Sequence, residues 1–243
     1  MKKLLSLCSV LIVFLGQAQD SKSIDSTAVY LMDKMSNVIG SLESVSFNIS
    51  TATDALTEKG EITTYYGSSE INMTGPNKLT SITKSDNGNF SYWYDGEYVS
   101  YYSYDENNYV TLDAPETILT MIDSMHTVFD FKFPAADFFY PSFTDDIIEE
   151  FDKISYEGNR NIENESCFYI TASNKEKSIQ LWISNTSTML PKRIVIVYKD
   201  QNNIQFETTF NNWVLNPNIP ESIYDFTAPP NASLISILAN SKL

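Results

Sequence analysis

A long stretch with a repeat of two residues constrains the fold of this chain more than any other feature. From Val45 to Leu112, Thr, Tyr, Ile, Val and Phe recur at alternate positions between short turn sequences. Because successive side chains of a strand point to opposite faces of a sheet, such alternation is typical of strands with one buried face. Asp86-Asn87-Gly88 and Asp95-Gly96 favour hairpin turns, since they tolerate positive φ angles. The stretch is predicted to be a meander of about six antiparallel strands.

The alternation returns in the second half of the chain. Ile179, Leu181 and Ile183 alternate with Gln180 and Trp182, which indicates one buried face and one solvated face. The predicted strands are 153–160, 166–173, 178–184, 191–199 and 204–214. The two blocks together predict an α+β fold that is mainly antiparallel β, with about 10–11 strands in one curved sheet.

Helical spacing interrupts the strands in four places. The first predicted helix is 25–42, where Ala28, Leu31 and Met35 begin an apolar stripe and Asp25 or Ser26 can cap. The second is 113–129, with Asp113 as a cap and Pro115 at an early helical position. Shorter helical stretches are predicted at 135–139 and 145–151. The helices are expected to gather on one side of the sheet.

The N-terminus predicts an export signal. Lys2 and Lys3 precede an apolar run from Leu4 to Leu15, which Gly16-Gln17-Ala18 follows as a small-x-small cleavage site. Residues 1–18 are therefore predicted to be removed, leaving 19–243 as a single periplasmic or secreted domain. The run is too short to span a hydrocarbon core of about 30 Å, so no integral membrane segment is expected after cleavage. Lipidation at Cys8 is the alternative, because Leu5-Ser6-Leu7-Cys8 has a lipobox-like pattern.

Charge and cysteine content narrow the classes of partner. The formal net charge is −15, and removal of Lys2 and Lys3 makes the mature chain more negative still. Such a chain repels phosphate backbones and anionic lipid headgroups, so no nucleic-acid partner is expected. Cys167 would be the single thiol of the mature chain, which excludes an intramolecular disulfide. A soluble monomer is expected.

The residues that carry enzymatic or metal chemistry are sparse. His126 and Cys167 give too few soft ligands for a zinc site, and the acidic group Asp145, Asp146, Glu149 and Glu150 lacks the alternating spacing of a calcium loop. The sequence has no nucleophile elbow, phosphate loop or dinucleotide fingerprint. No enzyme activity, metal or cofactor is therefore predicted. Trp93 and its neighbouring tyrosines allow two interpretations. They are ordinary packing residues of a sheet, or they form a platform that binds sugars or peptides.

The order of several short motifs resembles the DUF2092 family of predicted periplasmic proteins. The motifs that carry this resemblance are Tyr94-Asp95-Gly96, Tyr109-Val110-Thr111, Phe133-Pro134-Ala135-Ala136-Asp137, Tyr156-Glu157-Gly158, Gln180-Leu181-Trp182-Ile183, Leu190-Pro191-Lys192-Arg193, Phe210-Asn211-Asn212-Trp213 and Pro229-Pro230-Asn231-Ala232. The family looks like a branch of the LolA/LolB-like superfamily, whose members fold as unclosed antiparallel barrels with helices over an apolar concave face. The best-known members hold acyl chains of lipoproteins or other lipids in transit between two membranes.

The resemblance implies a non-enzymatic envelope protein that binds an apolar ligand, such as a lipid or lipid-modified protein, between sheet and helices. An interaction or sensor module with a packed interior is the alternative. An apolar void of several hundred Å³ would favour the first hypothesis and a filled interior the second. The residues expected to line the cleft are Phe47, Ile49, Tyr92, Tyr94, Ile118, Ile122, Met125, Phe129, Phe138, Leu181, Phe206 and Phe210.

Overall fold

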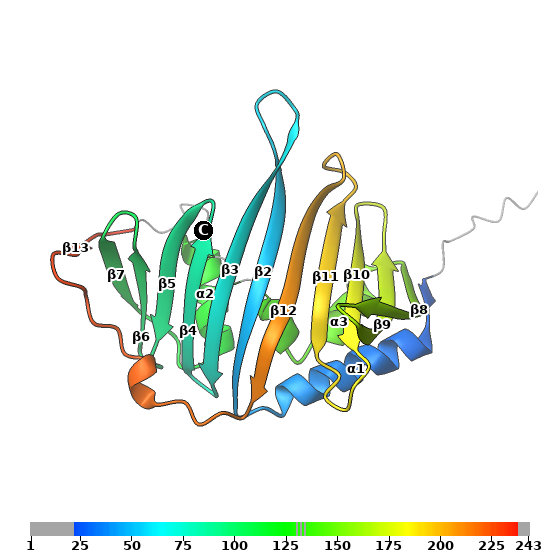
Figure 1. Ribbon diagram of the computed structural model, residues 1–243, viewed down its shortest axis with the longest axis horizontal. Helices are drawn as coiled ribbons and strands as arrows, with labels where there is room; N and C mark the ends of the chain where they lie inside the picture. The colour runs from blue at the N-terminus through cyan, green and yellow to red at the C-terminus, as the bar shows by residue number, and fades with distance from the viewer. Residues whose placement is uncertain (1–21, 130, 132, 134, 238–243) are drawn as a thin grey trace, which may run out of the picture.

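The computed structural model describes residues 22–129, 131, 133 and 135–237. The predicted signal peptide at 1–18, its cleavage site and Cys8 lie outside the described residues. Within the described part, thirteen strands form a single unclosed sheet in the order β1-β8-β9-β10-β11-β12-β2-β3-β4-β5-β6-β7-β13 (Figure 1). The strands are β1 (Ser23–Ile24), β2 (Ser44–Leu56), β3 (Ile62–Thr74), β4 (Lys78–Ser85), β5 (Gly88–Tyr94), β6 (Tyr98–Ser103), β7 (Asn108–Asp113), β8 (Lys153–Ile162), β9 (Glu165–Ser173), β10 (Lys177–Ser184), β11 (Pro191–Tyr198), β12 (Ile204–Leu215) and β13 (Ser233–Leu234).

Two meanders make up this sheet, and the last long strand joins them. The predicted meander from Val45 to Leu112 is confirmed as β2–β7, with positive φ at Gly88 and Gly96 in the expected hairpin turns. The five later strands are confirmed as β8–β12. Strand β12 returns to pair antiparallel with β2, so that Phe210 lies opposite Ile49 in the middle of the sheet. The two meanders therefore form one hydrogen-bonded sheet.

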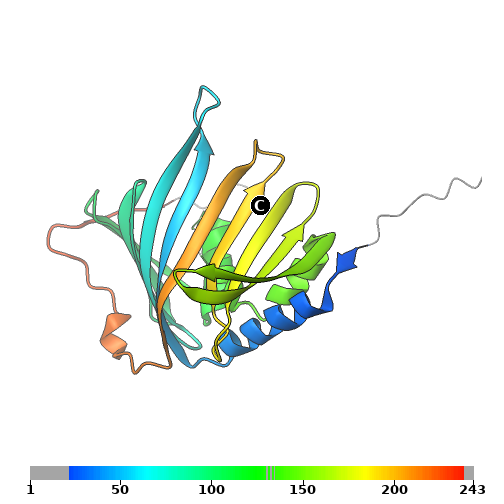
Figure 2. The ribbon, with the colours of Figure 1, turned by 45° about the vertical axis from the view of Figure 1, so that its right-hand side comes forward.

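Irregularities in the ladders accompany the curvature of the sheet. The register shifts at Trp182/Ile183, Asn211/Val214 and Tyr156/Asn159. Such bulges bend and twist a strand locally. The β8–β9 hairpin accordingly runs at a steep angle to β11 and β12 in the oblique view (Figure 2), and the sheet presents one concave face.

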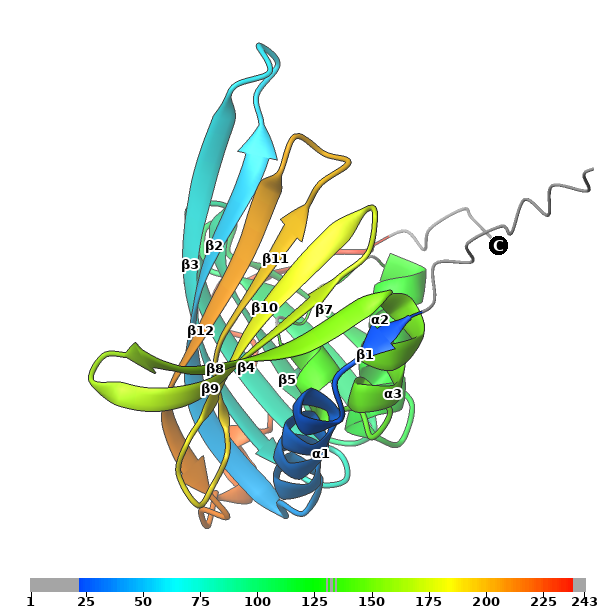
Figure 3. The same cartoon turned by 90° about the vertical axis from the view of Figure 1, so that its right-hand side faces the viewer.

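The helices lie on that concave side, as predicted (Figure 3). They are α1 (Ser26–Gly40), α2 (Ile118–Phe129), the 3-10 helix η1 (Ala136–Phe139) and α3 (Phe143–Glu150). Asp25 caps α1, because its side chain accepts a hydrogen bond of 2.7 Å from the Thr27 amide. Ala28, Leu31, Met32, Met35 and Ile39 form the buried stripe of α1. The main apolar core fills the space between these helices and the sheet.

Helix α2 begins later than the sequence pattern predicted. Asp113 is the last residue of β7, opposite Tyr98, and it does not cap a helix. The Ala114 amide donates to the Glu97 carbonyl over 2.9 Å, which keeps this segment extended beside the sheet. Thr117 is instead placed to cap α2, since its hydroxyl accepts from the Thr120 amide at 3.3 Å. Pro115 lies before the helix.

Two further predictions are corrected. The expectation of about 10–11 strands missed β1 and β13, which are two residues long and pair in parallel with β8 and β7 at the two edges. Strands this short carry no periodicity. The outer face is also less uniformly solvated than predicted, because Cys167, Tyr169, Trp182 and Val195 form a second buried cluster there. The guanidinium groups of Arg160 and Arg193 lie over the Tyr169 and Trp182 rings, 3.7 Å and 5.2 Å from the centroids.

Candidate apolar binding site

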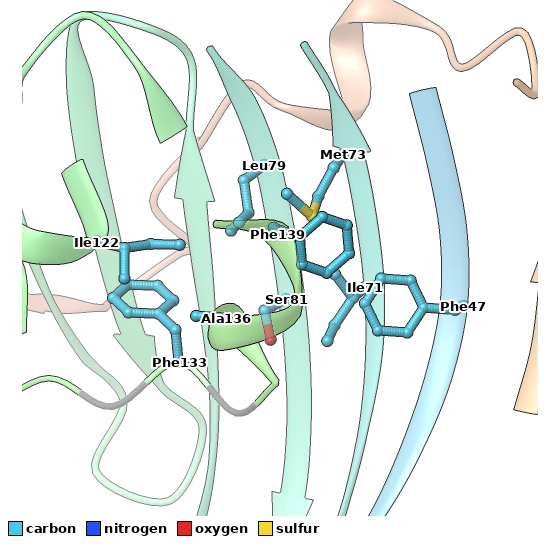
Figure 4. Close-up of a pocket in the computed structure, with 9 residues that line it drawn as sticks. All are labelled: Phe47, Ile71, Met73, Leu79, Ser81, Ile122, Phe133, Ala136 and Phe139. Atoms are coloured by element: carbon cyan, nitrogen blue, oxygen red, sulfur yellow. The ribbon is translucent and has the colours of Figure 1, made fainter. Parts of the chain in front are cut away.

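The candidate site lies where α2 and η1 face strands β2–β4. Eight apolar side chains and Ser81 enclose a cavity of about 20 Å³. The apolar residues are Phe47, Ile71, Met73, Leu79, Ile122, Phe133, Ala136 and Phe139. Figure 4 shows Ile122 and Phe133 on one side of this cavity and Phe47 on the other. The volume is that of about one water molecule, so at this site the space between helices and sheet is filled almost completely by the protein's own side chains.

Strand register explains why a gap remains at this point. Phe47 pairs with Ile71, Ile71 with Ser81, and Ser81 with Tyr92, so one row of inward side chains crosses four strands. The row is bulky except at Ser81. A small side chain between two large ones leaves space that the covering segment must fill. Phe133 and Phe139 enter from that segment and leave the small remainder.

Aromatic rings form much of the wall around the cavity. The Phe47 ring lies 4.3 Å from the Trp213 ring and 5.7 Å from the Phe139 ring, centroid to centroid. On the other side, Tyr92 lies 4.9 Å from Phe133 and 5.3 Å from Phe131. Such rings bury large apolar areas and pack in tilted or offset arrangements. They suit an aliphatic chain or a flat apolar group.

Burial keeps the tyrosines of this face neutral. Desolvation, with a smaller contribution from Tyr101, raises the pKa of the Tyr92 hydroxyl far above its ordinary value. Burial first, and then Asp95 and Glu116, raise the pKa of Tyr94 to about 12. Neither phenol ionises near neutral pH. Both rings serve as apolar bodies here, and the Tyr94 hydroxyl donates to the Pro115 carbonyl.

Polar contacts of α2 concentrate at its N-terminal end. The Ile118 amide donates to the Pro76 carbonyl at 2.9 Å, and the Tyr94 hydroxyl donates to the Pro115 carbonyl. Beyond the first turn, Ile122 and Met125 are buried against the core. Tyr140 donates to the Asp123 carboxylate at 2.6 Å, on the exposed side of the helix. The face of α2 that covers the sheet is therefore apolar along its length.

The predicted site residues divide into three groups. Phe47 and Ile122 line the cavity, and Tyr92 borders it through Phe133. Most of the others are buried in the surrounding core, namely Ile49, Tyr94, Ile118, Met125, Phe138, Leu181 and Phe210, with Phe129 half-buried against it. Phe206 is half-exposed and lies outside the buried core cluster. The structure thus brings together part of the predicted set and adds Ile71, Met73, Leu79, Ser81, Phe133, Ala136 and Phe139.

The chemically reactive side chains lie away from this cavity. His126 is exposed on α2, and Asp145, Asp146, Glu149 and Glu150 are exposed on α3. Cys167 is buried in the outer-face cluster, where desolvation raises its pKa. Within the described ranges, no group of three or more His, Cys, Asp or Glu side chains is placed to hold a metal ion. The helices of the described segments are all too short or too polar to cross a membrane.

These features define the class of the protein: an unclosed antiparallel half-barrel whose concave face is apolar and covered by helices. The chain belongs to the family described as predicted periplasmic protein (DUF2092), whose model matches residues 28–238. The family expected from the order of motifs is thereby confirmed. No curated protein matches the chain.

Solved structures with a similar fold have very different sequences. An uncharacterized conserved protein from Thermus thermophilus has 9% identity and a TM-score of 0.51, over 86% of this chain and 98% of that one. The lipoprotein LppX from Mycobacterium tuberculosis has 14% identity and a TM-score of 0.49, over 81% and 98%. A LolA superfamily protein from Nitrosomonas europaea has 8% identity and a TM-score of 0.35, over 82% and 97%. At 9% identity and a TM-score of 0.51, the likeness to the Thermus thermophilus protein concerns the fold alone.

Proposed function

We propose that this protein binds one apolar chain, carried by a lipid or a lipid-modified protein, between the sheet and the α2–η1 segment in the bacterial envelope. The observation that carries the proposal is the composition of the cavity wall, which is apolar except for Ser81. A family described as predicted periplasmic supports the compartment. Binding would rest on burial and shape and would need no catalytic group.

The size of the cavity sets a condition on this function. Pockets that hold drug-sized ligands have volumes of roughly 300–1,000 Å³, whereas this cavity has about 20 Å³. A ligand can enter only if α2 and η1 move away from β2–β4. Exposing an Ile or Met side chain to water costs roughly 1.5–3 kcal/mol, so four such residues would cost about 6–12 kcal/mol. Ile118, Met121, Ile122 and Met125 are the four buried on α2.

A bound acyl chain would offset most of that cost. Burying a sixteen-carbon chain gains at most roughly 12 kcal/mol, at about 0.8 kcal/mol per methylene. The chain would also replace the sheet as the apolar partner of α2, so the cost of exposing the helix residues applies to the open, empty state and not to the bound state. The cost of opening and the gain from burying the acyl chain are of similar size. A ligand can therefore replace the contacts between α2 and the sheet without a large net cost in free energy. The wide apolar face of α2 would remain covered in both states.

By the criterion of cavity volume, the filled interior favours a second candidate, an interaction module that binds a partner protein and no lipid. The β2–β3 hairpin projects beyond the neighbouring strands (Figure 1). Near its tip, Leu56 and Ile62 pair directly and are 42% and 52% exposed. An exposed apolar pair on a projecting element is a plausible protein contact. The two candidates differ in whether the concave face ever opens.

Substitutions at Ile122 separate the two candidates. In the lipid-binding protein, Ile122→Trp should obstruct the cleft and weaken uptake of a fluorescent fatty acid by about tenfold, because the indole occupies the ligand's place. Thr127→Trp, on the exposed side of the same helix, is the matched control and should leave uptake unchanged. The measurement is a fluorescence titration of the mature protein, together with native mass spectrometry after lipid extraction.

Stability measurements complete the test. A site that can open should tolerate Ile122→Ala with a loss below the roughly 2–5 kcal/mol typical of a filled core position. Ile122→Trp should likewise cost less than the typical 1–3 kcal/mol of overpacking. Large destabilisation by both variants, with no saturable fatty-acid uptake by the parent protein, would rule out the lipid cleft and leave the interaction module.

A further inference from the structure

A second cavity lies on the outer face of the sheet, opposite the helices. The segment that follows β12 passes the lower ends of β4 and β6 and then runs up beside β7, where it ends as β13 (orange to red in Figure 1). Its Phe226 ring lies 5.1 Å from the Trp93 ring and 5.4 Å from the Tyr109 ring. The buried Tyr224 hydroxyl is 2.7 Å from the Thr74 hydroxyl. These contacts fix the segment over the strands.

Register again explains the space beneath this segment. Trp93, Ser100 and Thr111 are direct partners across β5, β6 and β7, so they form one row on the outer face. Two small residues follow the indole, and their hydroxyls are 2.8 Å apart. With Asp95 and Tyr98 at the rim and Tyr224 and Phe226 above, they enclose a cavity of about 170 Å³. This outer cavity is much larger than the 20 Å³ space on the concave face.

Carboxylates dominate the electrostatics of the outer cavity. Asp95 lines the cavity, and Glu97 first, and then Asp113 and Asp95, raise the pKa of the Tyr98 hydroxyl at its rim. Lys78 is the nearby cation; it donates to the Asp95 carbonyl at 2.7 Å and pairs with Glu221 at 3.5 Å. Because Glu221 offsets Lys78, the rim stays negative, in a chain of net charge −15. A cation is attracted here and an anion is repelled.

We propose that the outer cavity binds a small organic ammonium ion, held between the aromatic rings of Trp93, Tyr98 and Phe226 and the carboxylate of Asp95. Ring faces attract alkylated ammonium groups through the negative face of the π-system. The Ser100 and Thr111 hydroxyls supply acceptors at the floor. A cavity of this volume holds a head group of a few heavy atoms.

A neutral sugar is the competing ligand, since sugars also stack on aromatic rings. The negative charge of the rim does not attract an uncharged sugar ring. Oδ1 of Asp95 already accepts from the backbone amides of Glu97 at 2.9 Å and Tyr98 at 2.8 Å, so this oxygen is engaged in the turn. Sugar recognition usually needs several convergent hydrogen-bonding groups. The charge on the rim therefore favours the ammonium ion.

The test compares choline with its neutral carbon isostere, 3,3-dimethyl-1-butanol, by calorimetry and NMR titration of the mature protein. We expect saturable binding of choline that is about tenfold tighter than binding of the isostere, and that weakens as salt is added. Asp95→Asn keeps an oxygen for both backbone amides and removes the charge, so it should weaken choline binding about fivefold or more without unfolding the protein.

Two tyrosine variants locate the site. Tyr98→Ala should weaken choline binding by a similar factor, whereas Tyr66→Ala, at an exposed position on β3 away from the cavity, should have no effect. Equal affinity for choline and its isostere, or no saturable choline binding by the folded parent protein, overturns the proposal. So does saturable glucose binding that Tyr98→Ala abolishes and Asp95→Asn leaves unchanged, because the cavity then accepts a neutral polyol. Each outcome is independent of fatty-acid uptake at the concave face.

Discussion

Asp25 connects the first helix to the edge of the sheet. Its Oδ1 accepts from the Thr27 amide at 2.7 Å, and its Oδ2 accepts from the Tyr156 amide at 3.1 Å, next to the bulge in β8. Its own amide donates to the Ile154 carbonyl at 3.0 Å. One carboxylate therefore both caps α1 and replaces ladder bonds where the register shifts. The bond from Tyr156, followed by that from Thr27, lowers the pKa of Asp25 below its ordinary value of 3.8.

This carboxylate should give stability a defined pH dependence. Because the folded-state pKa lies below the unfolded one, the contribution is complete well above pH 3.8 and is lost as the pH falls through the folded pKa. The melting temperature of Asp25→Ala should be lower than that of the parent by a constant amount from neutral pH down to about pH 5. The difference should shrink in more acidic buffer. Asp33→Ala, at an exposed position of the same helix, is the control. A gap that stays constant down to the acid limit of folding would contradict this assignment.

At the scale of elements, periodicity predicted the long strands and helix α1. It did not predict where α2 begins or that two short strands lie at the edges of the sheet. Strands β2–β12 and helix α1 alternate or repeat strongly, so their existence followed from residue order. The start of α2 did not, because Asp113 has cap chemistry but is held in β7 by its pairing with Tyr98. Edge strands of two residues carry no pattern at all.

The candidate site shows the same division. Ile71, Met73 and Leu79 lie at inward positions of β3 and β4. The alternation of each strand, aligned through the pairing of Phe47 with Ile71 and of Met73 with Leu79, could have identified them. Phe133 comes from the aperiodic stretch between α2 and η1, and Phe139 from η1 itself, which is too short for its spacing to show which side faces the sheet. The outer cavity depends on the C-terminal segment, whose Tyr224 and Phe226 contact residues of β3, β5 and β7 that are more than 100 positions away in the sequence. No local pattern predicts such a crossing.

The N-terminal attachment of α2 gives a prediction at this scale. Tyr94 is fully buried, and its hydroxyl donates to the Pro115 carbonyl just before the helix. Tyr94→Phe keeps the ring and removes this bond, so unfolding in urea should become easier by about 1–2 kcal/mol. Tyr66→Phe, at a position 63% exposed, should change stability by less than about 0.5 kcal/mol. If both variants unfold like the parent, the bond does not hold the start of α2.

For the whole molecule, the two faces of one continuous sheet carry separate environments. The concave face is filled with apolar side chains, and the outer face carries a polar cavity over β5–β7 and a small buried cluster over β9–β11. The same strands separate the two compartments, because alternate residues of each strand point to opposite faces. A ligand on one face can therefore bind without displacing side chains of the other.

Cys167 reports on opening of the molecule as a whole. Its thiol is fully buried in the outer cluster beside Tyr169 and Trp182, and burial raises its pKa, so both access and ionisation suppress its reactivity. A thiol reagent should label Cys167 only as fast as the sheet unfolds, and labelling should accelerate with urea in parallel with loss of tryptophan fluorescence. Glu58→Cys, on the exposed end of the β2–β3 hairpin, is the control and should be labelled at once in native buffer. Addition of reductant should leave the melting temperature unchanged, since Cys167 is a free thiol in the part of the chain that the structure describes. Rapid native labelling of Cys167 would show that β9 opens locally, and a shift of several degrees with reductant would show that Cys167 joins two molecules.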